Sequence, residues 1–356
     1  MSAVGVNVTG TGIATPRTPS RRLTTWIRRA AIASLVANIG IVVTGGVVRL
    51  TGSGLGCPTW PRCTAGSFVP HRALGVHSAI EFSNRMVTFV LAAVAIATFV
   101  LAWRYGRRSV LRLSLLLVLA VPAQAVIGGI TVLTDLNPWI VSLHLLVSLA
   151  MVGVAVTLVR RLGEGDDPPR RSVPVGMVRL TRAVLVVGWA VLYVGTVVTG
   201  SGPHAGDASA PRNGLNPRDL SQLHADLVFL LLGLTVAAVL VFRSAQVPLL
   251  VRRAAGTLLL VELAQGLVGF VQYVTDLPVV LVAFHLLGAA LVSAALTWLV
   301  LSVRTRDRLT ATGSTSGVPA GSVSAGWDET GSVSAGSAST GSPSAVVQTG
   351  STSGRP

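Results

Sequence analysis

The sequence predicts an all-α integral membrane protein, with eight transmembrane helices as two parallel four-helix-bundle repeats and a disordered C-terminal tail. Of its 356 residues, 51% are hydrophobic and 12% are charged, whereas soluble domains average about 25% charged residues. Apolar runs long enough to cross a bilayer recur along the chain. One long apolar segment of the first half also returns, with the same motifs, in the second half.

Eight apolar runs have the length of a membrane span. Arginines are frequent at both ends of the series and in every second connection, and few in the alternate connections. Because cytoplasmic loops are enriched in basic residues, both termini are expected in the cytoplasm of a multi-pass protein of the cell (plasma) membrane. The net charge of +15 therefore reports topology, and membrane lipid rather than nucleic acid is the expected partner. The predicted spans are 29–50, 78–102, 111–133, 139–159, 180–199, 221–242, 253–274 and 279–302.

The two groups of four spans look like copies of each other. The segment AQAVIGGITVLTDLNPWIVSLHLL, which begins at Ala123, aligns without gaps with AQGLVGFVQYVTDLPVVLVAFHLL, which begins at Ala264. Four spans per copy give parallel repeats. The Gly/Ser-rich end of the chain cannot bury a core and is expected to be disordered. The predicted organisation is 1–28 as a cytoplasmic N-terminal segment, 29–162 as the N-terminal half, 163–178 as a cytoplasmic linker, 179–303 as the C-terminal half and 304–356 as the tail.

Four histidines lie near the outer ends of the even-numbered spans, one in each. His77 aligns with His224 in the repeat, and His144 aligns with His285. A single histidine near a helix end is usually an interfacial or hydrogen-bonded residue, but four at matching depth indicate a shared role. Two facing imidazoles on neighbouring helices ligate a haem iron from both sides, so each half is predicted to hold one haem. Zinc is disfavoured, because it takes four close ligands and each half offers two histidines.

Several motifs resemble those of the haem A synthase family. They are GGVVRLTGSGLGCPTWPRC at 45–63, IEFSNR at 80–85, the internal repeat and the four histidines at the span ends. The resemblance covers about residues 28–303. It implies an oxidoreductase that oxidises the C8 methyl of haem O to a formyl group by two successive hydroxylations, which gives haem A for cytochrome oxidase.

The same resemblance implies the ligands and partners of the protein. A haem b cofactor is expected between His224 and His285 of the C-terminal half. The N-terminal half is expected to take the substrate haem O, with one iron ligand at His144. A haem O synthase is the expected neighbour, an electron acceptor is required, and a homo-oligomer is left open.

The second span departs from the family's pattern at Asn84. Many members have Glu-x-x-His-Arg where this chain has Glu81-Phe-Ser-Asn84-Arg85. Asparagine is a poor haem ligand. Either His77 replaces the missing ligand, about two turns and roughly 10 Å back along the same helix face, or the substrate site is poor in ligands. The internal repeat favours His77.

Glu81 is the predicted catalytic residue. It lies one helical turn from both His77 and Asn84 on the same face. The resemblance implies that this carboxylate is needed for activity, and a carboxylate in a partly dry site can take or give a proton. The alternative is an i,i+4 ion pair with Arg85. Arg85 and Arg49 are also candidates to bind haem propionates, although Arg49, at the end of its span, is equally able to snorkel.

Cys57 and Cys63 lie in the first outer loop. Outside the cytoplasm a disulfide is the default for such a pair. The family carries a cysteine pair in this loop, for which an electron-relay role has been suggested. A structural role and a redox role are therefore both open.

Two other functions account for part of the pattern. A non-catalytic b-type cytochrome that passes electrons explains the histidine pairs, but neither Glu81 nor the cysteine loop. A transporter explains four-helix repeats with buried polar residues, but it predicts broken helices at mid-membrane. The polar residues of this chain gather at the outer face instead.

Overall fold

The computed structural model describes residues 20–70 and 75–306. The predictions for the N-terminal segment before residue 20 and for the tail after residue 306 lie outside these residues. The described residues form eight α-helices, each long and apolar enough to cross a membrane, which confirms the all-α, multi-pass class. The helices are α1 (Arg21–Leu50), α2 (Gly75–Tyr105), α3 (Arg108–Leu133), α4 (Pro138–Arg161), α5 (Val175–Ser201), α6 (Pro217–Ser244), α7 (Leu249–Val274) and α8 (Val279–Ser302).

Several helices begin before the apolar run that predicted them. α1 begins at Arg21, where the hydroxyl of Ser20 accepts a hydrogen bond from the backbone N–H of Leu23 at 3.2 Å. Asn137 and Asn216 cap α4 and α6 in the same manner, each followed by a proline at the first helical position. Capping side chains, rather than the limits of hydrophobicity, therefore set these helix ends.

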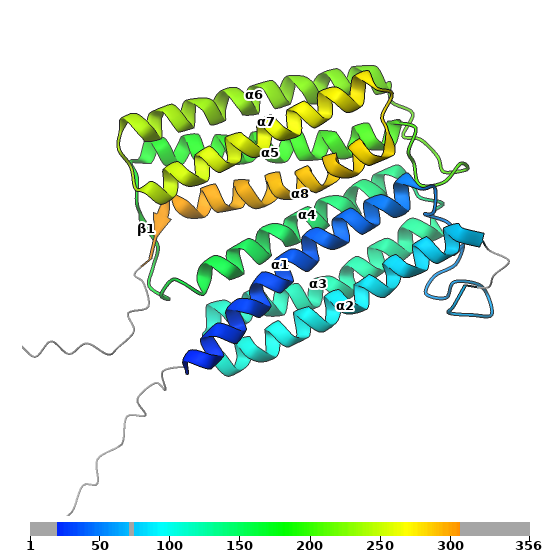
Figure 1. Cartoon of the computed structure of the whole chain (residues 1–356), viewed down its shortest axis with the longest axis horizontal. Helices are drawn as coiled ribbons and strands as arrows, with labels where there is room; N and C mark the ends of the chain where they lie inside the picture. The colour runs from blue at the N-terminus through cyan, green and yellow to red at the C-terminus, as the bar shows by residue number, and fades with distance from the viewer. Residues whose placement is uncertain (1–19, 71–74, 307–356) are drawn as a thin grey trace, which may run out of the picture. The chain divides into compact units, whose positions relative to one another are not determined.

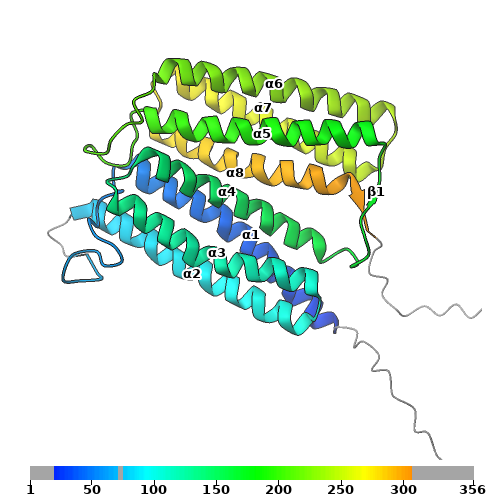
Figure 2. The same cartoon turned by 180° about the vertical axis from the view of Figure 1, so that it is seen from behind.

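The helices pack as two groups of four. α1 to α4 form a ring in which each helix contacts the next and α4 returns to α1, and α5 to α8 form a second ring (Figures 1 and 2). The rings meet where α8 packs against α1 and α4, and where α4 packs against α5. The apolar core of the second ring extends across this boundary to Val42, Leu149 and Val152 of the first ring. The relation of the two rings as internal repeats stays a prediction.

One aligned motif adopts the same backbone conformation in both rings. Asp135 and Leu136, after α3, have φ values of 52° and 59°, and Asp276 and Leu277, after α7, have φ values of 59° and 58°. The backbone N–H of each leucine bonds the carbonyl five residues earlier, at 2.7 and 2.8 Å. Left-handed backbone is uncommon for these residue types. Its presence at matching positions therefore favours the sequence alignment on which the repeat rests.

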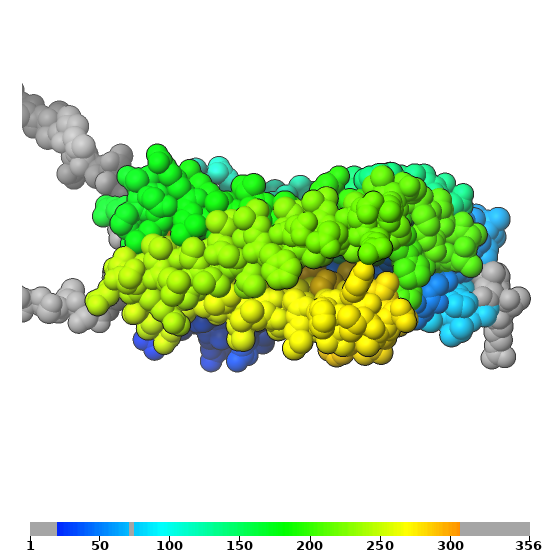
Figure 3. Space-filling model, turned by 90° about the horizontal axis from the view of Figure 1, so that it is seen from above, coloured from blue at the N-terminus to red at the C-terminus, as the bar shows by residue number. Residues whose placement is uncertain are grey.

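Large apolar side chains are exposed along the outer faces of the helices. Figure 3 shows the face that α6 and α7 form. Phe229 of α6 and Phe270 of α7 are 71% and 66% exposed. Surface of this kind is unfavourable in water but is accepted by lipid tails, whereas the helices satisfy their own backbone groups. The exposed surface thus agrees with a membrane-spanning protein.

The linker between α4 and α5 is tied to the helix ends on its side of the molecule. β1 (Arg170–Arg171) pairs with β2 (Arg304–Thr305) in a short antiparallel ladder that the sequence did not predict. Asp166 forms an ion pair with Arg107 at 3.0 Å and accepts a hydrogen bond from Ser109. The hydrogen bond and charge of Arg107 lower the pKa of Asp166 below its ordinary value.

We expect Asp166→Asn to loosen this linker. Because the pKa of Asp166 is lowered in the folded protein, the ion pair is fully formed at neutral pH and is lost only as the pH falls below about 3.9. The carboxylate of Asp166 is half exposed and solvent screens the pair, so the free energy of unfolding should fall by less than about 1 kcal/mol. Limited proteolysis at pH 7 should nevertheless cut the linker faster in Asp166→Asn than in Asp167→Asn, whose side chain forms no ion pair within the described residues. Equal cleavage rates would contradict this role.

Candidate functional site

A large cavity lies in the first helix ring, under the first outer loop. Its volume is about 1010 Å³, at the upper end of the range for small-molecule pockets, about 300–1,000 Å³. Its walls come mainly from apolar residues of α1 to α4, and Thr199 of α5 and Leu286 of α8 contribute from the second ring. The polar side chains on its walls include Asn38, Arg49, Glu81, Asn84, Arg85, Gln124, His144 and Ser148.

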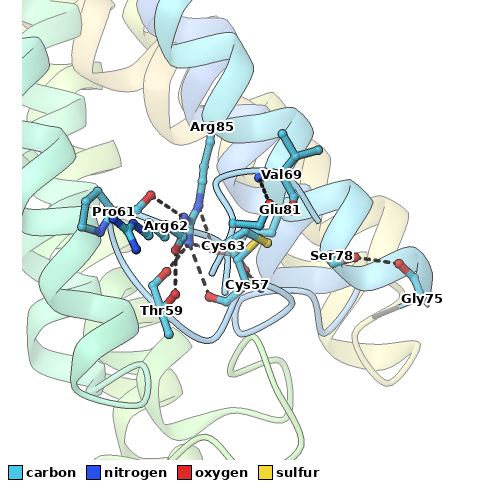
Figure 4. The surroundings of a disulfide bond; sticks show 11 residues. Cys57, Thr59, Pro61, Arg62, Cys63, Val69, Gly75, Ser78, Glu81 and Arg85 are labelled. Carbon is cyan, nitrogen blue, oxygen red and sulfur yellow. Dashed lines mark hydrogen bonds and ion pairs between the residues drawn. A yellow bond between two sulfur atoms is a disulfide. The ribbon is translucent and has the colours of Figure 1, made fainter. Parts of the chain in front are cut away.

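Glu81 is held between this cavity and the outer loop. Its side chain is buried, and one carboxylate oxygen, Oε2, accepts a hydrogen bond from the backbone N–H of Cys57 at 2.7 Å. The other oxygen, Oε1, pairs with Nη2 of Arg85 at 2.5 Å (Figure 4). The ion pair considered from the sequence is therefore formed. The same carboxylate also lines the cavity, so the pair does not exclude a chemical role.

Arg85 binds the main chain of the outer loop as well as Glu81. Its guanidinium donates to the carbonyl of Thr59 at 3.2 Å and to those of Cys57, Pro61 and Arg62 at 3.4 Å (Figure 4). In this structure the group expected to bind haem propionates therefore fastens the loop to α2. Its propionate role stays a prediction.

The loop is also closed covalently and by packing. Cys57 and Cys63 form the predicted disulfide, with both side chains fully buried. Trp60, between them in the chain, lies directly against Gly129 of α3, where any side chain at residue 129 would overlap the indole. The disulfide loop thus covers the outer end of the cavity and contacts both α2 and α3.

Arg49 connects the two rings at the outer face. Its Nε donates to the carbonyl of His204 at 2.6 Å, and its Nη2 donates to the carbonyl of Thr199 at 2.8 Å. The ring of His204 in turn donates from Nε2 to the carbonyl of Leu277 at 3.0 Å. The side chain of Arg49 therefore bonds to protein carbonyls rather than extending to lipid headgroups, and it also lines the cavity.

The structure separates the two candidate histidines of the first ring. His144 lines the large cavity together with Asn84, whose Oδ1 is buried without a hydrogen-bond partner among the described residues. His77 lies two turns closer to the outer end of α2. Its Nδ1 bonds the hydroxyl of Ser53 at 2.9 Å, and it lines a separate pocket of about 450 Å³ beside Asp207. The ligand role of His77 stays a prediction that this placement does not favour.

The two candidate histidines of the second helix ring lie close together. The imidazole centroids of His224 and His285 are 6.5 Å apart, with an interplanar angle of 69°. Two metal–nitrogen bonds of about 2 Å each, together with the two ring radii, span roughly this separation. The imidazole of His224 lies against Gly195 of α5, and the imidazole of His285 lies against Gly269 of α7. The separation of the two histidines therefore fits an iron placed between their imidazoles.

Sequence reasoning missed two kinds of residue around the histidines. Gln124 and Gln265 donate to the carbonyls of His144 and His285, and Gly128, like Gly269, borders an imidazole. These residues were aligned in the repeat but received no role. The signal was the recurrence of Ala-Gln-x-x-x-Gly in both halves, 141 residues apart.

Comparison with known proteins places this architecture in a family. Residues 28–212 match the family described as cytochrome oxidase assembly protein, COX15-CtaA. A Heme A synthase from Lysinibacillus sphaericus (strain C3-41) is 32% identical over 179 residues, which cover 49% of this chain and 58% of the relative. A Heme A synthase from Bacillus cereus (strain G9842) is 27% identical over 316 residues, which cover 83% of this chain and 98% of the relative.

The matches differ in how much of each relative they cover. The match to the L. sphaericus protein spans less than two thirds of that relative, whereas the match to the B. cereus protein spans nearly all of it. Since the family match alone takes in about half of the chain and includes the large cavity's helices α1 to α4, this chain belongs to the COX15-CtaA family of cytochrome oxidase assembly proteins.

Proposed function

We propose that this protein is a haem A synthase, an oxidoreductase that converts the C8 methyl of haem O to a formyl group. The observation that carries the proposal is the cavity of about 1010 Å³, which both the buried carboxylate of Glu81 and the imidazole of His144 line, in a chain of this family. The named relatives supply the reaction, and the cavity supplies a place for it.

Haem O, the substrate, occupies the cavity of the first ring. His144 ligates its iron from α4, and the apolar residues of α1 to α4 enclose the macrocycle. Asn84 stands on the cavity wall where many family members have a second histidine, and His77 lies outside that wall. Of the two alternatives raised by the sequence, a substrate site with few ligands therefore fits the geometry better.

Glu81 moves the protons of the reaction. Oxidising a methyl group to a formyl group releases protons beside the carbon that reacts, and a carboxylate on the cavity wall is positioned to accept them. The hydrogen bond from Cys57 and the ion pair with Arg85 fix both carboxylate oxygens. The disulfide loop excludes water from the outer end of the site and thus supports this placement.

Haem b, the cofactor, is held in the second ring by His224 and His285. The separation of 6.5 Å between the two imidazole centroids supports this assignment. When bound, haem b supplies a one-electron redox centre near the substrate. The residues of the chain contribute the ligands, the apolar surroundings and the short distance to the first ring, since Leu286 follows His285 in α8 and lines the substrate cavity.

The membrane setting follows from the same proposal. The arginine-rich connections lie on the side of the linker, so we place both termini in the cytoplasm and the disulfide loop on the outer side of the cell membrane. A haem O synthase must supply the substrate, an oxygen donor such as water must supply the formyl oxygen, and an electron acceptor must remove the electrons.

The first test is haem extraction from cells that make haem O, with and without this protein. Haem A should appear only with the protein. Glu81→Gln keeps the shape of the side chain but removes its proton-accepting form, so the rate of haem A formation should fall by about 10²–10⁴-fold. Glu164→Gln, which changes a linker carboxylate, is the matched control. Haem A formation that survives Glu81→Gln would remove the catalytic role, and bound haem b without any haem A would favour the b-type cytochrome.

Replacing each histidine of the first ring tests the substrate ligand. His144→Ala should abolish haem A formation while the haem b spectrum of the second ring remains. His77→Ala should retain most haem A formation, because the imidazole lies outside the cavity. If His77→Ala abolished product as His144→Ala does, with haem b still bound, the second iron ligand would be His77 after all.

A further inference from the structure

One glutamine and one glycine of the same helix contact the same histidine of the next helix, and this occurs in both rings. Nε2 of Gln265 donates to the carbonyl of His285 at 2.7 Å. One turn along α7, a Cβ on Gly269 would lie 3.0 Å from Cε1 of that imidazole. In the first ring, Gln124 donates to the carbonyl of His144 at 3.0 Å, and a Cβ on Gly128 would lie 3.2 Å from its Cε1.

These contacts matter because the imidazoles lack the usual support. A histidine that binds a metal normally donates its second ring nitrogen to a carboxylate, carbonyl or water, which fixes the orientation of the ring. Nδ1 of His144 and Nδ1 of His285 have no hydrogen-bond partner in the part of the chain that the structure describes. The orientation of each imidazole must therefore come from the position of the histidine's backbone and from the surfaces that the imidazole touches.

We propose that Gln265 and Gly269 in α7, and Gln124 and Gly128 in α3, are positioning residues for the haem-ligating histidines. The glutamine fixes the rotation of the histidine's helix, and the glycine admits the ring against the neighbouring backbone. The proposal rests on the proposed function, because it assumes that His285 and His144 ligate haem iron.

The glutamine and the glycine act on the histidine in different ways. A helical carbonyl has a second lone pair after its helix bond is made, so a glutamine amide can bond it without disturbing the helix. The amide then joins α7 to α8 at the residue that carries the ligand. A side chain at residue 269 would press on the imidazole of His285, which would have to shift by a few tenths of an ångström. Metal ligands tolerate displacements of only about 0.5 Å.

His285 in the second helix ring is held more closely than His144 in the first. Oε1 of Gln265 occupies the place where a Cβ of Gly288 would lie, so a side chain one turn after His285 would displace the Gln265 amide. In α4 the position aligned with Gly288 is Val147. Gln124 of α3 donates instead to the hydroxyl of Ser148 of α4, at 2.6 Å. The closer fit belongs to the ring that is proposed to keep a resident cofactor.

The glycine contact is specific to the histidine rather than a general need of α7. At Gly266, one turn before Gly269 in the same helix, a Cβ would meet no other atom within 4 Å among the described residues. Alanine favours helix more than glycine does, so neither Gly266→Ala nor Gly269→Ala should lower the helical stability of α7. Haem loss without loss of stability is therefore the signature that separates positioning from folding.

The test uses the full-length protein purified with its bound haem. Gly269→Ala and Gln265→Leu should weaken retention of haem b by roughly 10–100-fold, as expected for residues that orient a metal ligand. They should also convert the six-coordinate low-spin absorption spectrum toward a five-coordinate one. Gly266→Ala and Gln272→Leu are the matched controls on the same helix and should match the unmodified protein. Thermal unfolding of each protein, freed of haem, reports folding separately.

The possible results distinguish this inference from the function on which it rests. If the unmodified protein shows low-spin haem b and Gly269→Ala and Gln265→Leu show the same spectrum and retention, the positioning role is wrong while the proposed cofactor stands. Equal haem loss in the targeted and control variants would also overturn it. If the unmodified protein holds no such haem, the cofactor assignment fails and the inference fails with it.

Discussion

Charged side chains within an apolar helix bundle must find partners inside the protein, because lipid offers none. Glu81, Arg85 and Arg49 satisfy this constraint with loop backbone. The carboxylate of Glu81 accepts from an N–H of the disulfide loop. The guanidinium of Arg85 donates to carbonyls of the same loop, and that of Arg49 donates to the carbonyl of His204 between α5 and α6. The groups proposed to give the site its chemistry thus also fasten the loops that cover it.

The same bonds bring the two rings together at the end where both haem sites are proposed. Arg49 crosses from α1 to the carbonyls of Thr199 and His204. Leu286 packs against Gly46, where a Cβ would lie 2.5 Å from its Cδ1. Because Leu286 is the neighbour of His285 in α8, the wall of one site is continuous with a ligand of the other. Under the proposed function, electrons released in the first helix ring would therefore have a short, packed route to the second.

Sequence reasoning succeeded where the signal is periodic or local, whereas the choice between His77 and Asn84 depends on depth along the helix, which a sequence pattern does not give. Hydropathy located all eight helices, and the two cysteines in one outer loop predicted their disulfide. The pairing of His77 with His224 used an offset of 147 residues, whereas His144 and His285 are 141 apart. Asn84 lies 140 residues before His224 and lines the cavity. Helical periodicity shows which residues share a face, but two turns along that face separate the cavity from the outer surface.

The two proposed haem sites differ in the number of histidines that reach them, one in the first helix ring and two in the second, and this difference has a physical meaning in this scheme. A haem held from both sides by His224 and His285, each seated against a glycine, is suited to remain through many turnovers. A haem that must enter as substrate and leave as product gains nothing from equally tight ligation, since binding that is uniform in substrate and product slows release. A cavity with His144 on one wall and Asn84 on another meets that need. The departure at Asn84 is therefore compatible with catalysis, because a weaker hold on the iron makes exchange of substrate for product easier.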